Sequence, residues 1–230
     1  MRSGVVIFPG SNCDRDMIVA IRQITGKTPI KIWHKENNIP SLDLIVIPGG
    51  FTFGDYLRCG ALAARSPVIG SIKNHISRGG TVLGVCNGFQ ILIEAKILPG
   101  SLIRNKKLLF TCRETTIEVQ SCMKNPFLSG LKIGECLKIP VAHNEGNYFA
   151  PKDLLKQLKE EGRIALKYSR QKDYENNYNP NGSIEDIAGI LSNNGRVLGM
   201  MPHPERAINH LHGGTDGLKL LSNCIEQIIG

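Results

Sequence analysis

The sequence is poor in aromatic residues, which make up 6% of its 230 positions and include a single tryptophan. They are not interleaved with lysine and arginine, as a base-stacking platform for nucleic acid requires. The formal net charge of +8 therefore predicts a solvated surface, or a docking face for an acidic partner, rather than a nucleic-acid site. We expect no nucleic acid among the partners of this chain.

Three further features are missing. None of the seven cysteines forms a Cys-x-x-Cys pair, so we expect no metal site. No apolar run reaches the roughly 18–20 residues of a membrane span, and we expect no membrane association. The charged start, Met1–Phe8, lacks a cleavage site, so it is interpreted as a first strand and not as a signal peptide. These absences predict a cytoplasmic protein with reduced cysteines, most of them packing residues.

Length and composition predict a single domain that spans residues 1–230. In the first hundred residues, short apolar runs alternate with helical patterns, which indicates buried parallel strands covered by helices on both faces. We therefore expect an α/β fold with a doubly wound, mostly parallel sheet. β-branched runs in the middle of the chain indicate a small antiparallel addition.

The expected elements can be placed along the chain. We expect strands over Gly4–Phe8, Ile30–Trp33, Leu44–Ile47, Thr81–Val85, Leu108–Phe110, Thr115–Val119, Leu137–Val141, Ile164–Tyr168, Ile187–Leu191 and Val197–Met201. The expected helices cover Asp14–Thr25, a segment that ends at Ile76, Phe89–Ala95, Lys152–Glu161 and Leu218–Ile229. The segment Gln171–Ser183 is polar and rich in asparagine, which fits a disordered loop. Its Asn179–Ser183 part, however, has turn chemistry that suits a fixed interface loop.

The segment Gly84-Val85-Cys86-Asn87-Gly88 places a cysteine between a predicted buried strand and a predicted helix. This is the pattern of a nucleophile elbow, with cysteine in place of serine. The glycines flank the cysteine because such a turn crowds the backbone and leaves no room for Cβ atoms. The positive end of the helix favours a thiolate at this place. The pentapeptide alone fits a core cysteine near a turn equally well.

A second motif, Pro202-His203-Pro204-Glu205-Arg206, follows the predicted strand Val197–Met201. Its two prolines exclude a regular helix or a central strand, so it should be a rigid loop at a strand end. In such a loop, His203 can act as a base that Glu205 orients. Most His-Pro-Glu tripeptides are ordinary surface loops. Together with Cys86, however, this one predicts a Cys86–His203–Glu205 triad.

The motif Pro48-Gly49-Gly50-Phe51 ends another predicted strand. Ligands of parallel sheets bind beyond the carboxyl ends of the strands. Gly49 and Gly50 let backbone N–H groups approach a reacting carbonyl, and with the N–H of Asn87 they can form an oxyanion hole. A tight turn that needs positive φ explains the two glycines equally well. The sequence alone does not separate these alternatives.

Several segments together resemble a known family. The motifs Gly84–Gly88 with Gln90, Pro48–Phe51 and Pro202–Glu205 are similar to those of class I, or triad, glutamine amidotransferases, and this resemblance implies their flavodoxin-like fold. Within that family, the chain resembles the glutaminase subunits of phosphoribosylformylglycinamidine synthase over nearly its whole length. The segments that carry this resemblance are Phe8–Asp14, Gly54–Ala61, Arg104-Asn105, Phe110–Arg113, Val141–His143, Asn179–Ser183 and Gly199–Arg206. One departure is Asn144, where the resemblance predicts glycine.

The resemblance implies a role for each member of the triad. Cys86 would attack the amide carbon of glutamine. His203 would activate the thiol and protonate the departing ammonia, while Glu205 would orient His203. Water would then cleave the glutamyl thioester.

The resemblance also implies how glutamine and the oxyanion are bound. Backbone N–H groups around Gly50, Phe51 and Asn87 would hold the oxyanion, and the side chain of Gln90 would help bind glutamine. No metal is implied on this chain.

The implied partners are a synthetase (large) subunit, which would carry out the synthesis, together with a small bridging subunit. The synthetase would use ATP and magnesium to convert formylglycinamide ribonucleotide into its amidine with the ammonia. This chain would carry no cofactor, and it has no Gly-x-x-x-x-Gly-Lys-Ser/Thr loop of its own, in agreement with ATP being bound elsewhere. Arg58, Arg113 and the loop Asn179–Ser183 are candidate docking residues, because polar groups held in loops often bind partners.

Three alternatives stay open. A glutaminase of another amidotransferase pathway would share the triad but not the segments Gly54–Ala61 and Asn179–Ser183. A cysteine hydrolase of the dienelactone type would place its acid before the histidine. A redox sensor or chaperone built on the same sheet takes its acid from an upstream strand. Within the glutaminase interpretation, His143 is the alternative base should His203 prove dispensable.

Overall fold

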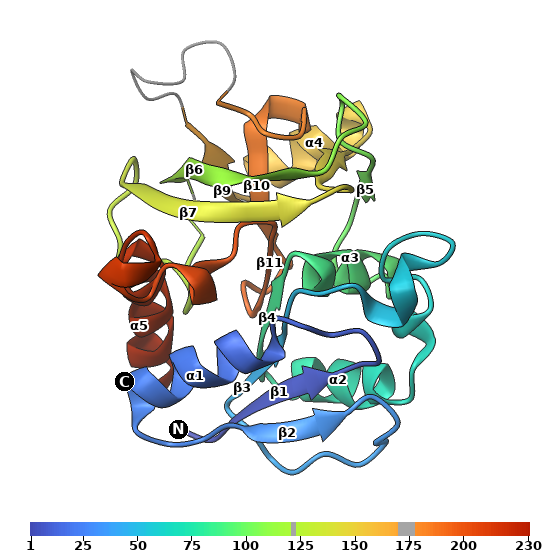
Figure 1. Cartoon of the computed structure of the whole chain (residues 1–230), viewed down its shortest axis with the longest axis vertical. Coiled ribbons are helices and arrows are strands. Elements are labelled where there is room, and N and C mark those ends of the chain that lie inside the picture. Colours follow the sequence, from blue (N-terminus) through green and yellow to red (C-terminus); the bar gives the residue numbers. More distant parts are fainter. Residues whose placement is uncertain (121–122, 170–177) are drawn as a thin grey trace.

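The computed structural model describes residues 1–120, 123–169 and 178–230. Nine described strands form one sheet in the order β2-β1-β3-β4-β11-β10-β9-β6-β7 (Figure 1). The first five are parallel: β2 (Ile30–Trp33), β1 (Ser3–Ile7), β3 (Leu44–Ile47), β4 (Thr81–Val85) and β11 (Val197–Met200). The other four pair antiparallel: β10 (Ile187–Leu191), β9 (Ile164–Tyr168), β6 (Thr111–Val119) and β7 (Cys136–His143).

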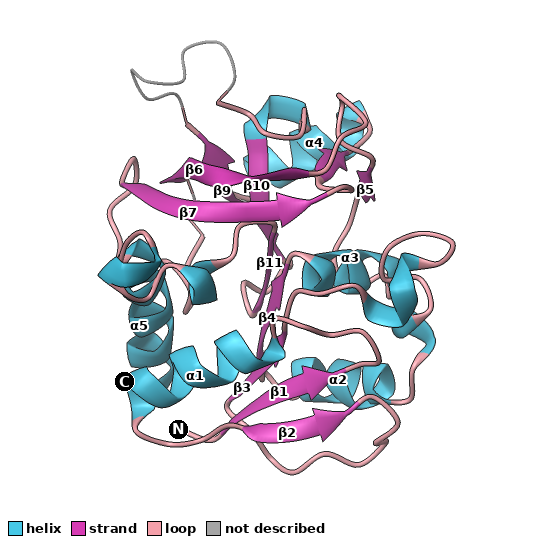
Figure 2. Ribbon diagram, in the orientation of Figure 1, coloured by secondary structure: helices cyan, strands magenta, loops and turns pink. Residues whose placement is uncertain are grey.

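Helices cover both faces of the parallel strands (Figures 1 and 2). On one face lie α1 (Asp14–Thr25) and α5 (Asp216–Ile229), and on the other lie α2 (Val68–Ser77) and α3 (Asn87–Glu94). The antiparallel end of the molecule carries α4 (Lys152–Glu160) and a two-stranded sheet of β5 (Ser101–Ile103) and β8 (Asn147–Phe149). The expected doubly wound α/β fold with an antiparallel addition is confirmed, and the addition joins the parallel strands through the β10–β11 pair.

Most of the expected elements are confirmed, but the strand expected over Leu108–Phe110 is wrong. This segment is an exposed loop, and Leu108 has a φ of +57°, which strands do not adopt. The side chain of Asn105 holds the loop, because its Nδ2 donates to the Leu109 carbonyl at 2.9 Å. The short strands β5 and β8 are not predicted, because three-residue runs carry no readable alternation.

The polar segment expected as a loop over Gln171–Ser183 lies partly outside the described residues, since 170–177 are not described. Its described part is held by Asn179, whose Oδ1 accepts hydrogen bonds from the N–H groups of Asn181 at 3.2 Å and Gly182 at 2.8 Å. This side-chain turn confirms that Asn179–Ser183 is a fixed loop.

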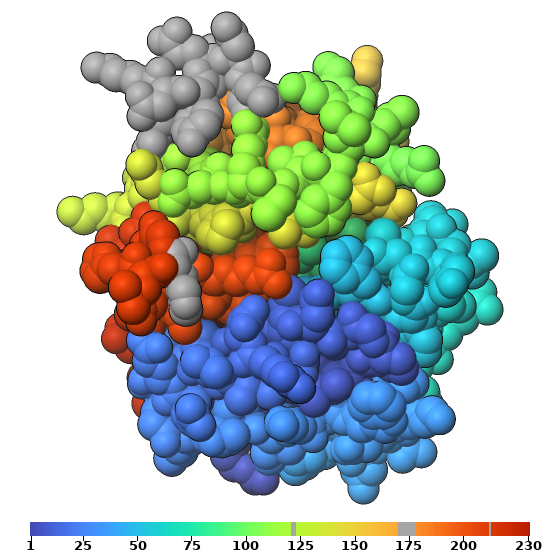
Figure 3. All heavy atoms as spheres, in the orientation of Figure 1, coloured from blue at the N-terminus to red at the C-terminus, as the bar shows by residue number. Residues whose placement is uncertain are grey.

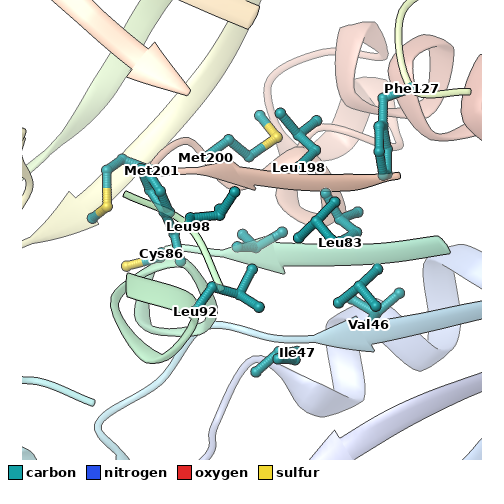
Figure 4. Packing of buried hydrophobic residues seen from close by; sticks show 14 of the residues in the cluster. Val46, Ile47, Leu83, Cys86, Leu92, Leu98, Phe127, Leu198, Met200 and Met201 are labelled. Atoms are coloured by element: carbon teal, nitrogen blue, oxygen red, sulfur yellow. The ribbon is translucent and has the colours of Figure 1, made fainter. Parts of the chain in front are cut away.

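The middle of the sheet forms the core that supports the carboxyl ends of the strands. Every residue of β3 and β4 is buried, and α3 packs on them. Figure 4 shows Leu83, Leu92 and Met201 within this core, with the Cys86 sulfur at its edge and pointing away from the packed side chains. None of the described helices is long and apolar enough to cross a membrane.

Candidate active site

Cys86 lies on a sharp turn between β4 and α3, with φ +50° and ψ −105°. Such a conformation costs a non-glycine residue on the order of 1–3 kcal/mol, so the surrounding packing must hold it. A Cβ on Gly88 would lie 1.9 Å from the Ile47 carbonyl oxygen, and one on Gly84 would lie 2.4 Å from a methyl group of Leu92. Both flanking glycines are therefore required for the elbow, as the sequence predicts.

The Cys86 thiol is buried at the start of α3, with 5% of the residue exposed. Its Sγ donates a weak hydrogen bond to the Ala142 carbonyl, which lies in β7, at 3.6 Å. The backbone N–H of Cys86 donates to the Met200 carbonyl of β11 at 2.7 Å. The cysteine is thus held between the parallel part of the sheet and the antiparallel strand β7.

His203 and Glu205 form a buried pair on the loop that follows β11. His203 Nδ1 lies 2.7 Å from Glu205 Oε1, and the two residues are 1% and 2% exposed. Because a carboxylate only accepts, Nδ1 is the protonated nitrogen. Burial alone would lower the pKa of His203, but the charge of Glu205 and the nearby Cys86 and Cys13 thiols raise it well above its ordinary value.

The pair faces the elbow because β4 and β11 are neighbouring parallel strands, whose carboxyl ends meet at one edge of the sheet. The backbone N–H of His203 donates to the Pro140 carbonyl of β7 at 2.8 Å, which fixes the loop. Among the described residues, His203 Nε2 has no hydrogen-bond partner. The structure therefore brings Cys86, His203 and Glu205 together, with one imidazole nitrogen free to exchange a proton with the thiol.

His143 also lies in the site, but its environment disfavours proton transfer. It is buried, and its Nε2 lies 3.3 Å from Asn181 Nδ2, within the fixed loop Asn179–Ser183. Burial and, second, the charge of His203 lower the pKa of His143 to about 4. A base with such a low pKa is weak at neutral pH, which favours His203 over His143.

Of the N–H groups predicted to hold an oxyanion, that of Phe51 is engaged elsewhere. The Phe51 N–H donates to the Gly10 carbonyl at 3.0 Å and so does not point into the site. Gly50, which precedes it, has a φ of +148°, a conformation that suits glycine. The N–H of Asn87 lies in the first turn of α3, where backbone donors have no partner within the helix. In this state the Asn87 N–H is placed to serve as an oxyanion donor, whereas the Phe51 N–H is not.

Gln90 and Asn87 connect the loops around the cysteine. Asn87 Nδ2 donates to Gln90 Oε1 at 2.8 Å, and Gln90 Nε2 donates to the Glu145 carbonyl at 2.6 Å. The backbone N–H of Thr52 donates to Asn87 Oδ1 at 3.2 Å. The unexpected Asn144 beside Glu145 is exposed, and the loop is held there by its backbone carbonyl, which accepts from the N–H of Asn105 at 2.9 Å.

Sequence reasoning missed one cysteine near the triad. Cys13, expected to be a packing residue, has its Sγ within 4.8 Å of a His203 nitrogen and a Glu205 oxygen. Arg206 Nη2 donates to that sulfur at 3.1 Å. The signal was available, since Cys13 follows β1, whose carboxyl end meets the same edge of the sheet. Three such ligand atoms can hold a metal ion, but the guanidinium beside the sulfur opposes a cation.

A cysteine on an elbow after one parallel strand, facing a His–Glu pair after the next, defines a class of enzymes that act through a thiol nucleophile. The chain belongs to a family within that class: residues 1–215 match the CobB/CobQ-like glutamine amidotransferase domain. It is therefore a glutamine amidotransferase.

Individual relatives narrow the comparison. The chain is 50% identical over 226 residues, which are 98% of both chains, to the phosphoribosylformylglycinamidine synthase subunit PurQ of Brucella suis. It is 48% identical over 230 residues, the whole of both chains, to the protein of the same name from Bartonella henselae. Among solved structures, a chain of PurLQS from Thermotoga maritima is 39% identical, with a TM-score of 0.86 and coverage of 98% of this chain and 97% of that one.

A more distant structure shares the fold alone. A second Thermotoga maritima protein, described as a glutamine amidotransferase, superposes with a TM-score of 0.64 at 15% identity, over 100% of this chain and 98% of that one.

Proposed function

We propose that this chain is the glutaminase subunit of a phosphoribosylformylglycinamidine synthase. It hydrolyses glutamine to glutamate and ammonia, and it delivers the ammonia to a synthetase subunit. The observation that carries the proposal is the identity of about half of all residues to proteins named PurQ, over 98% or more of both chains. A chain of the PurLQS structure, with the same fold over almost its full length, supports the same assignment.

In the first step, the Cys86 sulfur forms a bond to the amide carbon of glutamine. The thiol proton passes to Nε2 of His203, while Glu205 keeps the other ring nitrogen, Nδ1, protonated. The carbonyl oxygen becomes an oxyanion, which the N–H of Asn87 at the start of α3 stabilises. The raised pKa of His203 supports this role, because it favours the imidazolium form that proton transfer creates.

In the second step, the carbon–nitrogen bond breaks. The proton on His203 Nε2 passes to the leaving nitrogen, so that ammonia departs and a glutamyl thioester remains on Cys86. A water molecule then attacks the thioester, with His203 as its base, and glutamate leaves as the thiol is restored. Gln90, whose amide is already fixed beside the loop of Glu145, helps bind the glutamine.

The proposed partners are the synthetase subunit, to which ATP and magnesium belong, together with a small bridging subunit. Of the candidate docking residues, Arg58 has the most suitable position. Its side chain is 71% exposed, and it is held by two hydrogen bonds to Glu94. Tyr56 and Leu57 beside it are also exposed, so apolar side chains are available to a partner at the same place. The segment 51–65 projects at the side of the molecule (cyan in Figure 3).

The other docking candidates are less suitable. Within the loop Asn179–Ser183, Asn181 and Ser183 are buried and hold His143 and the Tyr148 N–H, so they are not available to a partner. Arg113 is partly buried. We therefore restrict the proposed docking face to Tyr56, Leu57 and Arg58. We also propose a cytoplasmic location, because the nucleophile must stay a free thiol.

His203 and Glu205 should differ in how much they contribute. Replacing His203 by alanine is expected to lower kcat by the roughly 10²–10⁴-fold of a general base. The loss of kcat in Glu205→Gln should be smaller, because the amide still contacts the imidazole ring. Only the orientation and charge of the ring are disturbed. Combining Cys86→Ala with His203→Ala should cost no more than Cys86→Ala alone. Steady-state glutamate release measures all three. Near-normal turnover in the His203→Ala variant would transfer the role of base to His143.

Reconstitution tests the proposed function. The chain is mixed with glutamine, ATP, magnesium, formylglycinamide ribonucleotide and the synthetase and bridging subunits, and formation of the amidine is followed together with glutamate release. We expect both products in equal amounts, and the Cys86→Ala chain should support amidine formation only from added ammonium. Glutamate release without amidine would instead indicate a glutaminase of another pathway. If neither product forms, the hydrolase or redox-sensor alternatives gain support.

A further inference from the structure

Behind the imidazole of His203 lies a polar contact that the two steps above do not use. Cys13 comes directly before α1 and is 2% exposed. Its sulfur accepts a hydrogen bond from Arg206 Nη2 at 3.1 Å, and Arg206 Nε lies 3.4 Å from Asp16 Oδ2. The guanidinium is therefore held by two groups at the start of α1.

The same guanidinium is next in sequence to a buried carboxylate with which it does not pair. Glu205 Oε1 contacts His203, but among the described residues Glu205 Oε2 has no hydrogen-bond partner. Burial alone would lower the pKa of Arg206, but Cys13 and the charge of Glu205 raise it, so the charges of Arg206 and Glu205 attract each other. A guanidinium that reaches a carboxylate forms a short, charge-assisted pair with it. In this structure the guanidinium is instead held by Cys13 and Asp16.

Arg206 has room to turn. A groove of about 660 Å³ is lined by Arg206, Asp16, His203 and Glu205, together with residues of α1 and β7. The Arg206 side chain is 36% exposed, so it is not locked by packing. The Glu205 carboxylate is itself buried, but the Cys13 sulfur that holds the guanidinium lies within 4.8 Å of one of its oxygens. A guanidinium released from that sulfur is therefore a short movement from Glu205.

We propose that Cys13 is a positioning residue, whose sulfur holds Arg206 away from Glu205 so that the carboxylate serves His203 alone. The role rests on the proposed glutaminase function, because it concerns the same His203–Glu205 pair. With Arg206 on Glu205, the carboxylate would share its charge between guanidinium and imidazole. His203 would then be less basic and less firmly oriented toward the thiol.

The groups that face His203 define what a pH measurement would report. They are Glu205 on its own loop, Cys86 from the elbow, Cys13 from the start of α1 and His143 from β7. Arg206 contacts Cys13, and Asp16 contacts Arg206, so both act on His203 only indirectly. Of these groups, Arg206 is the one that the loss of Cys13 releases, so a change in its position should alter the titration of His203 through Glu205.

The test measures the titration of the His203 ring by NMR in the chain alone, with the signal assigned by its loss in His203→Ala. In Cys13→Ala the pKa of His203 should fall by about 1 unit, as expected when an opposite charge is partly withdrawn. Cys13→Ser keeps an acceptor for Arg206 and should leave the pKa unchanged. Adding Arg206→Gln to Cys13→Ala removes the competing cation and should restore most of the pKa, the remainder being what the Cys13 thiol itself contributes.

Steady-state kinetics give the second readout. For Cys13→Ala, kcat should fall about 10-fold with an unchanged KM for glutamine, and the basic limb of the kcat/KM profile should move to lower pH. Cys13→Val fills the space without offering an acceptor, and it should behave like the alanine variant if that variant does not fold.

Two results would overturn the inference. One is an unchanged His203 pKa in both Cys13→Ala and Cys13→Val. The other is a lowered pKa that Arg206→Gln does not restore, because the cysteine would then act on His203 without Arg206. Failure of the proposed function looks different: the unmodified chain releases no glutamate even with its partners, while the NMR titration still decides the role of Cys13.

Discussion

Replacing Cys86 by alanine is expected to reduce glutamine hydrolysis to the uncatalysed background. The variant keeps the His203–Glu205 pair and the oxyanion donor of α3, but it has no sulfur that can form the thioester. Alanine carries the same Cβ as cysteine, so it tolerates the φ of +50° no worse, and the elbow glycines stay in place. The fold should therefore survive. Glutamate release, with thermal unfolding as a check on folding, measures the effect.

Covalent labelling is an independent test that Cys86 is the nucleophile. A diazoketone analogue of glutamine should modify Cys86 in stoichiometric amount. Burial and the Asp55 and Glu145 carboxylates raise the pKa of Cys59, and burial raises the pKa of Cys224 to about 12, so both should stay unmodified.

The labelling has its own controls. Cys112 and Cys136 are exposed, so a simple alkylating agent should modify them. If the glutamine analogue leaves them unmodified, its selectivity comes from its glutamine part. Cys59→Ser should be labelled at Cys86 as fully as the unmodified chain. Stoichiometric labelling of Cys13 or Cys59 would contradict the elbow assignment. Cys122 lies outside the described residues.

The second large effect is expected from the partners. Binding of the synthetase subunits with their nucleotide should raise kcat for glutamine by roughly 10²–10³-fold, the value of one oxyanion donor. The Phe51 N–H is bonded to the Gly10 carbonyl, so the peptide between Gly50 and Phe51 must turn over before it can serve the oxyanion. Glycine at position 50 makes that rotation possible at little steric cost.

The measurement compares kcat at saturating glutamine for the chain alone and in the complex. Arg58→Ala should lower the activation without changing the rate of the chain alone. Lys31→Ala, an exposed lysine on the distant edge strand β2, should change neither. Equal rates alone and in complex would mean a constitutively active glutaminase and would remove the reason for a gated oxyanion hole.

Much of the fold was predictable, because its parallel half consists of strands that are buried on both faces. Runs such as Leu44–Ile47 and Thr81–Val85 have no polar face, and the structure has these strands with the expected bounds. Cys86 and His203 could be placed together for the same reason, since each follows such a strand. The elbow glycines were predictable as well, because the space they need is set by the turn itself.

What the sequence did not predict depends on contacts between distant loops. Leu108–Phe110 has the composition of a strand, but the Asn105 side chain fixes it as an exposed loop. The hydrogen bond from the Phe51 N–H to the Gly10 carbonyl depends on the orientation of one peptide group, and no side chain determines that orientation. The residues next to Cys13 in the sequence do not mark it as special. Its contact with Arg206 forms only because the carboxyl ends of β1 and β11 meet at one edge of the sheet.

Two backbone carbonyls of strand β7 accept hydrogen bonds from residues of the candidate active site. Its Ala142 carbonyl accepts from the Cys86 thiol, and its Pro140 carbonyl accepts from the His203 N–H. Cys86 and His203 follow β4 and β11 in the chain, but both are also hydrogen-bonded to carbonyls of the single strand β7. Since β7 is the outermost strand of the antiparallel half, one side of it is unpaired within the sheet. A displacement of β7 would therefore move the acceptors of the Cys86 thiol and of the His203 backbone N–H together.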